Sequence, residues 1–312
     1  MTEAPRTEIR YANAPVTWGI WGAHTLPEHR TPEHILRAIE IAGYDGVELG
    51  PLGLFGTAAE VRDGLDRHQL SLAGAYVPIR FLDGPNAVEE DLAVLEQVCR
   101  LVAACEPSAP IILAGESVPA IQQYVGRGAS HPELDLDAEA WRALLEILER
   151  ARTTVSSHRL IDTFHPHTGT YIEQPHEVDR LLEASDIALT LDTGHAAAGG
   201  DDPLDLLRRW SGRVAHVHLK DIDTDSVTRA QREERKFGMA DAAVPLGVGD
   251  LQLDGFLAEL DRMSYTGWVV VEQDRRPDGG HDHAAVDEEQ RTNLAWIRER
   301  GTRHQPSSQR RS

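Results

Sequence analysis

The sequence predicts an α/β fold, a single (β/α)8 TIM barrel, and three features of the chain support this prediction. Short apolar runs with the character of strands alternate with segments of helical periodicity along the 312 residues. The apolar runs lack polar alternation, which is typical of parallel strands covered on both faces. The later runs end in metal-binding and proton-handling residues, as barrel strands do at an active site.

The first half of the chain supplies four predicted pairs of strand and helix. The strands are expected at residues 14–20, 45–49, 70–77 and 110–114. The first helix begins at Thr31 and Pro32, an N-cap followed by a proline that suits the first turn, and it ends at Gly43. The later helices are expected at residues 57–68, around 92–102 and at 137–156.

The second half repeats the alternation four more times. Its strands are expected at residues 160–165, 187–192, 214–219 and 267–272, and its helices at 175–184, 202–210, 253–263 and around 294–297. Two long connections, 115–135 and 222–250, both follow strands. They are interpreted as lids or as contacts in a homo-oligomer, with structureless insertions as the alternative.

The barrel is expected to span residues 13–301. Residues 1–12 are interpreted as an N-terminal extension, and residues 302–312 form a basic tail with few apolar residues, which we expect to be disordered.

The charge balance excludes several classes of partner. The chain has a net charge of −20, which repels phosphate backbones, so we expect no nucleic-acid partner and no anionic membrane surface. It contains no run of about 20 apolar residues that would span a bilayer, and its start lacks the apolar core of a signal peptide. We therefore expect a cytoplasmic protein.

Chemically functional side chains collect where the predicted strands of the second half end. They are His165 and His167, Asp192 and His195, His218, Lys220 and Asp221, and Glu272. Because barrel strands all end at one mouth, these side chains are expected to meet there. Carboxylates with imidazoles suit Mn²⁺, Co²⁺, Mg²⁺ or Zn²⁺, and we expect a divalent metal, with Mn²⁺ favoured. Simple capping of the strand ends would explain any one of these residues, but less well all four strands together.

The alternation of a strand separates the candidate ligands. His216 and His218 point to the same side, and His218 is the predicted ligand because it lies nearer the strand's end. His216, one layer deeper, is interpreted as a core histidine or a support for the ligand. His195, three residues beyond Asp192, has left the strand and is better placed to contact substrate.

Four segments resemble the xylose-isomerase-like barrel superfamily of sugar isomerases, epimerases and dehydratases. They are Phe164-His-Pro-His-Thr-Gly-Thr-Tyr-Ile-Glu173, Leu191-Asp-Thr-Gly-His195, His216-Val-His-Leu-Lys-Asp221 and Gly267-Trp-Val-Val-Val-Glu272. Within the superfamily the chain most resembles the inosose (2-keto-myo-inositol) dehydratases. That group also opens with a segment like residues 14–18 and has a His-x-His-x-Gly-Thr motif. The resemblance covers residues 14–300.

The resemblance implies a ligand set. Asp192, His218 and Glu272 match three of the superfamily's four metal ligands, and His195 matches its substrate-contacting histidine. The fourth ligand of the epimerases and isomerases is a glutamate near the end of strand five, where this chain has His165. Glu173, just past that strand, is the alternative fourth ligand.

The departure at His165 bears on the reaction. The resemblance implies that an epimerase of this superfamily uses two glutamates, one on each face of the substrate. A histidine in place of one of these glutamates removes that symmetry. Elimination of water needs only a metal that polarises a ketone, one base and one acid. The predicted function is therefore a metal-dependent lyase that removes water from a keto-cyclitol or keto-sugar through a metal-stabilised enediolate.

The expected roles and the alternatives follow from this prediction. Glu272 is the expected base, and the acid is one of His167, His195 and Lys220. The expected substrate contacts are Trp18, Glu48, His195, Lys220 and Asp221. A metal-dependent sugar isomerase or epimerase is the first alternative; a C-glycoside deglycosidase-type lyase subunit and a non-catalytic metal or sugar-binding barrel are further ones.

Overall fold

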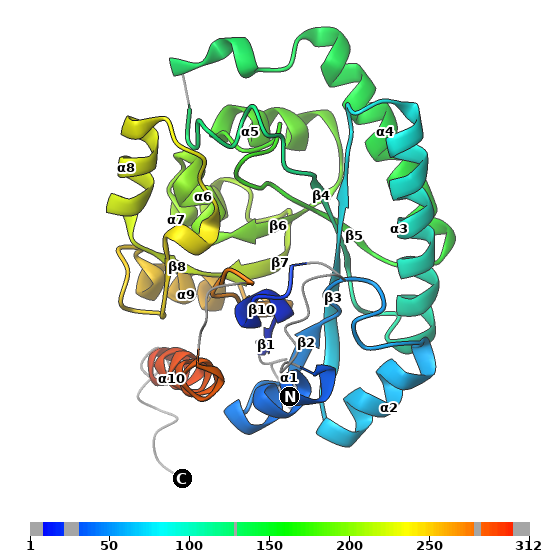
Figure 1. The fold of residues 1–312 in the computed structure, drawn as a ribbon, viewed down its shortest axis with the longest axis vertical. Coiled ribbons are helices and arrows are strands. Elements are labelled where there is room, and N and C mark those ends of the chain that lie inside the picture. The colour runs from blue at the N-terminus through cyan, green and yellow to red at the C-terminus, as the bar shows by residue number, and fades with distance from the viewer. Residues whose placement is uncertain (1–8, 22–30, 128–129, 278–281, 302–312) are drawn as a thin grey trace, which may run out of the picture.

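Eight parallel strands close into a barrel in the computed structural model, which describes residues 9–21, 31–127, 130–277 and 282–301 (Figure 1). The strands are β1 (Arg10–Asn13), β2 (Gly46–Glu48), β3 (Ser71–Ile79), β4 (Ile111–Gly115), β5 (Asp162–His165), β6 (Ala188–Asp192), β7 (Val214–Leu219) and β10 (Trp268–Val271). They neighbour one another in the order β1-β10-β7-β6-β5-β4-β3-β2. This arrangement confirms the predicted (β/α)8 barrel.

Helices lie around the barrel (Figure 1). They are α1 (Pro32–Ala42), α2 (Ala58–His68), α3 (Pro85–Cys105), α4 (Ala138–Ser157), α5 (Pro175–Ala184), α6 (Thr193–Gly199), α7 (Pro203–Arg209), α8 (Thr224–Glu233), α9 (Leu253–Arg262) and α10 (His283–Gly301). Thr31 caps α1 as predicted, accepting the His34 backbone N–H at 3.2 Å. Within the described residues, no helix combines the length and apolar character needed to cross a bilayer.

The predicted position of the first strand is wrong. The strand β1 occupies Arg10–Asn13, and a 3₁₀ helix spans Pro15–Trp18 where the strand was expected. Pro15 has no N–H to donate to a strand ladder, and Gly19 ends the 3₁₀ helix with a positive φ of 76°. The apolar residues of this segment are buried against α10 instead. The barrel therefore begins inside the expected N-terminal extension, and the expected tail 302–312 lies outside the described residues.

The two long connections fold on each other. The strand β8 (Asp221–Ile222) leads into the connection 222–250, which contains α8, a 3₁₀ turn (Met239–Asp241) and β9 (Ala243–Val244). The strands β8 and β9 pair in an antiparallel ribbon. Val125 from the connection 115–135 packs in one small hydrophobic core with Val227, Phe237 and Met239. Both connections follow strand ends, so this second core lies on the same end of the barrel as the candidate site.

Candidate functional site

Three strands bring Asp192, His218 and Glu272 together at the end of the barrel. Each offers one ligand atom, and these atoms lie within 4.8 Å of one another. The register between β6 and β7 shifts between Leu189 and Thr190, so that Asp192 stands opposite His218. A shift of this kind re-aims the side chains that follow it. The three ligands predicted from motif and strand parity thus share one small volume.

Two of the atoms that face this volume lack a hydrogen-bond partner among the described residues. His218 Nδ1 lies 3.6 Å from Asp192 Oδ2 and 3.3 Å from Glu272 Oε2. Both Nδ1 of His218 and Oδ2 of Asp192 are buried without a hydrogen-bond partner among the described residues. Buried polar atoms in proteins are nearly always partnered, so an imidazole nitrogen and carboxylate oxygens converging in this way fit a divalent cation.

His165 lies beside this cluster at the end of β5. Its Nε2 lies 3.4 Å from Asp192 Oδ2, and its Nδ1 is buried and has no hydrogen-bond partner within the described part of the chain. His165 also belongs to a group with Asp192 and His195 whose ligand atoms lie within 4.8 Å of one another. The predicted departure from a glutamate therefore places an imidazole beside the ligand cluster.

Glu173, the alternative fourth ligand, is engaged elsewhere. Its carboxylate accepts the backbone N–H groups of Gly126 at 2.5 Å and Gly169 at 2.9 Å, and Arg127 Nη1 lies 3.3 Å away. Burial raises the pKa of Glu173 to about 7. The residue fastens the connection 115–135 to the end of β5, and this geometry favours His165 as the fourth ligand.

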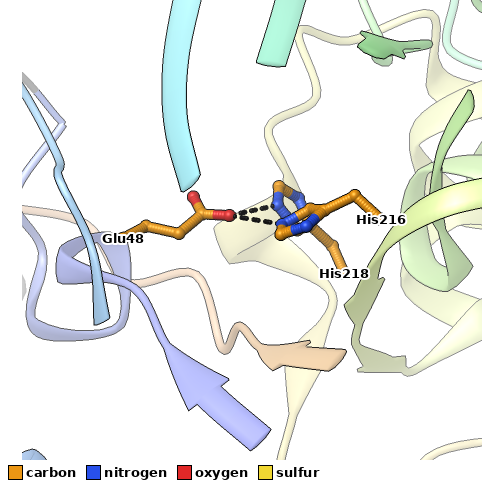
Figure 2. A group of neighbouring side chains, drawn as sticks. All are labelled: Glu48, His216 and His218. Atoms are coloured by element: carbon orange, nitrogen blue, oxygen red, sulfur yellow. Dashed lines mark hydrogen bonds and ion pairs between the residues drawn. The ribbon is translucent and has the colours of Figure 1, made fainter. Parts of the chain in front are cut away.

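Glu48, one of the expected substrate contacts, reaches into the barrel interior. It is the last residue of β2, and its Oε1 lies 2.8 Å from the Nε2 atoms of both His216 and His218 (Figure 2). His218 therefore presents one ring nitrogen to Glu48 and the other to the ligand cluster. Its burial would lower its pKa, but Glu272 and Glu48 raise the pKa well above the usual value. His216 contacts the same oxygen of Glu48 as His218, which fits its interpretation as a support for the ligand.

Lys220 is a buried cation among carboxylates. Its Nζ donates to Glu272 Oε2 at 2.5 Å and to Asp274 Oδ2 at 2.5 Å, and it lies 3.4 Å from Asp192 Oδ2. Burial alone would lower the pKa of Lys220, but the three carboxylates raise it well above its ordinary value. Burial also raises the pKa of Glu272. Lys220 thus stays charged beside the expected base.

Asp221 and Trp18, two expected substrate contacts, hold the fold together. The Asp221 carboxylate accepts backbone N–H groups from a single turn of chain and from its own neighbour, namely Gly247, Gly249, Leu251 and Ile222. Trp18 lies in the main hydrophobic core, and its indole N–H donates to Asp287 of α10 at 2.9 Å. For both residues the structure supplies a packing role that strand-end position alone does not reveal.

His167 and His195 lie side by side next to the cluster, with their ring planes tilted by 35°. Their ring centroids are 3.8 Å apart. Nδ1 of His195 accepts from the Thr168 backbone N–H at 3.2 Å, which leaves its proton on Nε2. Burial lowers the pKa of His167 to about 3 and the pKa of His195 well below its usual value, so both rings are neutral.

Two further residues belong to the site. Asp274 binds Lys220, and Tyr76 of β3 stands edge-on to His165 with ring centroids 6.0 Å apart. Asp274 lies two residues after Glu272, so strand alternation would place the two side chains on the same side. Tyr76 has the strand parity of an inward residue in the run 70–77, which is the signal that would have included it.

The chain belongs to the xylose isomerase-like TIM barrel family, whose profile matches residues 36–300. Among curated proteins it is 28% identical to an inosose dehydratase of Geobacillus kaustophilus over 88% of this chain and 90% of that protein. It is 27% identical to an inosose dehydratase of Clostridium perfringens over 87% of this chain and 92% of that protein. These relatives confirm the resemblance on which the sequence-based prediction rests.

Solved structures show the same fold at lower identity. A 3-keto-D-glucoside 4-epimerase from E. coli aligns with a TM-score of 0.67 and 16% identity over 94% of this chain and 100% of that one. A probable 3-DHS dehydratase from Bacillus anthracis gives a TM-score of 0.67 with 16% identity, over 93% of this chain and 99% of that chain. The IOLI protein, solved with a zinc atom, aligns with a TM-score of 0.66 and 12% identity over 93% of this chain and 98% of that chain.

Proposed function

We propose that this protein is a metal-dependent dehydratase that removes water from a keto-cyclitol or keto-sugar of the inosose type. The observation that carries the proposal is the convergence of Asp192, His218 and Glu272, in which Asp192 Oδ2 and His218 Nδ1 are buried without a hydrogen-bond partner among the described residues. Support for the substrate class comes from the inosose dehydratases, which match this chain over most of both lengths.

The residues that would hold the metal are His165, Asp192, His218 and Glu272. Their nitrogen and oxygen donors suit Mn²⁺ first, with Co²⁺, Mg²⁺ and Zn²⁺ as alternatives. A divalent cation bound there would polarise the substrate ketone and acidify the neighbouring C–H group.

Glu272 is the proposed base. It would take the proton from the carbon next to the ketone, and its raised pKa makes it a better proton acceptor than an exposed carboxylate. Lys220 contacts the same carboxylate, and its ammonium would stabilise the ionised form of Glu272 once the proton has passed to the departing hydroxyl. Asp274 holds the Lys220 ammonium from the other side and keeps it charged.

The histidine pair is proposed to serve the departing hydroxyl. The C–O bond would break with its electron pair on oxygen, and the hydroxyl would accept a hydrogen bond from a neutral imidazole N–H of His195 or His167 and leave as water with the proton that Glu272 took from carbon. His195 keeps its proton on Nε2 because Thr168 occupies Nδ1. Lys220 is bonded to the base, so it is less suited than the imidazoles to serve the departing group.

The distribution of side chains favours elimination over epimerisation. Epimerisation by two carboxylates needs one on each face of the substrate, whereas here the carboxylates around Lys220 other than that of Asp192, namely those of Glu272 and Asp274, lie together just after β10. The imidazoles of His165, His167 and His195 gather at β5 and the start of α6.

The test is an assay of the purified protein against inosose and a panel of ketoses, with chelator and with added Mn²⁺. We expect metal-dependent formation of an ultraviolet-absorbing dione or enol from inosose, because dehydration of an α-hydroxyketone creates a conjugated product. A product of unchanged mass without such absorbance would identify an isomerase or epimerase. Metal binding without turnover of any candidate would identify a binding protein, and either result would overturn the proposal.

A further inference from the structure

Glu48 enters the barrel interior at a place prepared by β3. The pairing of β2 with β3 shifts between Val47 and Glu48, and Glu48 stands opposite Gly74. A Cβ at Gly74 would lie 2.9 Å from the Ile112 Cδ1, 3.3 Å from Glu48 Oε1 and 3.4 Å from His216 Cε1. The absence of a side chain at Gly74 therefore leaves the space in which Glu48 meets the two histidines.

A single carboxylate oxygen serves both imidazoles. Glu48 Oε1 lies 2.8 Å from Nε2 of His216 and 2.8 Å from Nε2 of His218 (Figure 2). The side chains are 4%, 0% and 2% exposed for Glu48, His216 and His218, so bulk water does not compete for these contacts. A carboxylate can only accept, so each ring carries a proton on Nε2 and donates it to Glu48.

The donated proton decides which nitrogen of His218 is available. With Nε2 bound to Glu48, only Nδ1 is left to face Asp192 and Glu272, at 3.6 Å and 3.3 Å. A carboxylate that accepts the far N–H of a ligating histidine fixes the ring's tautomer and orientation and makes the ligating nitrogen more basic. His216 shares the same oxygen from one layer deeper and holds it between the two rings.

We infer that Glu48 is a positioning residue that, together with His216, aims Nδ1 of His218 at the proposed metal centre. The inference rests on the proposed function, because it assigns a role toward that metal. It also excludes a second cation between Glu48, His216 and His218, although their ligand atoms lie within 4.8 Å of one another. A cation there would take the place of the two protons that Glu48 accepts and would force His218 to bridge two ions.

The experiment measures binding of Zn²⁺ and Mn²⁺ to the metal-free protein by calorimetry. We expect one equivalent in the wild type and an affinity about 10–100-fold lower in Glu48→Gln, the usual effect of losing such a partner. The matched control is Glu177→Gln, which removes a buried carboxylate of α5 that binds the backbone of Glu173 and Gln174, and its metal affinity should equal that of the wild type.

A spectroscopic measurement distinguishes a role of Glu48 in orienting His218 from a role in the stability of the protein. In the Zn²⁺-loaded protein, NMR of isotope-labelled histidine should show the proton of His218 on Nε2 and the metal on Nδ1. Gly74→Ala offers a second route, because it keeps every polar group while crowding Glu48 and His216. Its metal affinity should be lower than that of the wild type, as in Glu48→Gln.

The outcomes distinguish this inference from the proposed function. Wild-type affinity in Glu48→Gln, or ligation of His218 through Nε2, would overturn the role of Glu48 and leave the metal centre standing. Two equivalents in the wild type, one of them lost in Glu48→Gln, would show a second cation site and also overturn it. Undiminished affinity in Asp192→Asn would instead overturn the metal centre itself.

Discussion

The two halves of the barrel differ in what they place at the strand ends. Ala114 of β4 pairs in register with His165 of β5, so the same level of the barrel carries a methyl group on one strand and an imidazole on the next. From β5 onward the interior holds His165, Asp192 and His218, whereas β1 and β3 contribute Ala12 and Ala73 to a small apolar cluster. The chemistry is concentrated in the second half, and the first half chiefly supplies packing. Glu48 of β2 and Tyr76 of β3 are exceptions, since both reach the site from the first half.

The largest effect is expected at the carboxylates of the second half. Glu272→Gln removes both the proposed base and a proposed ligand, and turnover of inosose should fall by about 10⁴-fold, the upper range for a proton-transfer group. Asp192→Asn should lose metal-supported turnover to a similar extent. Steady-state kinetics with added Mn²⁺ measures both, and circular dichroism confirms the fold. Full activity in either variant would mean that the second half does not carry the chemistry.

Lys220 tests whether the charge cluster of the second half also contributes to stability. Lys220→Met leaves Glu272 and Asp274 buried without the cation between them. Removing one partner of a buried ion pair typically costs about 3–5 kcal/mol. Urea unfolding of the metal-free protein should show a loss of this size. A loss below about 1 kcal/mol, the range of surface pairs, would contradict the burial of this cluster.

A variant of Asp221 tests whether this residue of the second half has a structural role or contacts the substrate. Asp221→Asn weakens the hydrogen bonds to the backbone of Gly247, Gly249 and Leu251. Hydrogen bonds to charged groups contribute about 1.5–3 kcal/mol, so the free energy of unfolding should fall by that amount. The KM for inosose should stay unchanged. A raised KM with unchanged stability would restore Asp221 as a substrate contact.

The smallest effect is expected in the first half. Ile112→Val removes one methyl group from a fully buried position of β4. The free energy of unfolding should fall by about 0.5–1.5 kcal/mol. Metal affinity and turnover should match the wild type, since no ligand changes. A loss of metal affinity here would show that the two halves are not separable in function.

Most of the fold was predictable because each barrel element carries its own local signal. The strands β5, β6, β7 and β10 fall within or next to the predicted runs, and their apolar content is the cause. The first strand failed because apolar residues also occur where a 3₁₀ helix packs on α10, and composition does not separate the two cases. The helix α6 was missed since it begins directly at the capping residue Asp192.

The candidate site was predictable to the extent that strand parity decides it. Asp192, His218 and Glu272 converge as parity and motif indicated. The role of Glu48 depends on a shift in the register between β2 and β3, and no local pattern in the sequence predicts such a shift. Asp221 likewise follows a strand end, but the chain folds back over it in the ribbon of β8 and β9. This contact is tertiary, so the local sequence does not indicate it.

The most direct test is anomalous diffraction from crystals of the protein grown with Mn²⁺. The account predicts a single strong peak bounded by Asp192 Oδ2, His218 Nδ1 and Glu272 Oε2, with His165 at its edge. A peak elsewhere in the barrel, or none at these three atoms at saturating Mn²⁺, would contradict it.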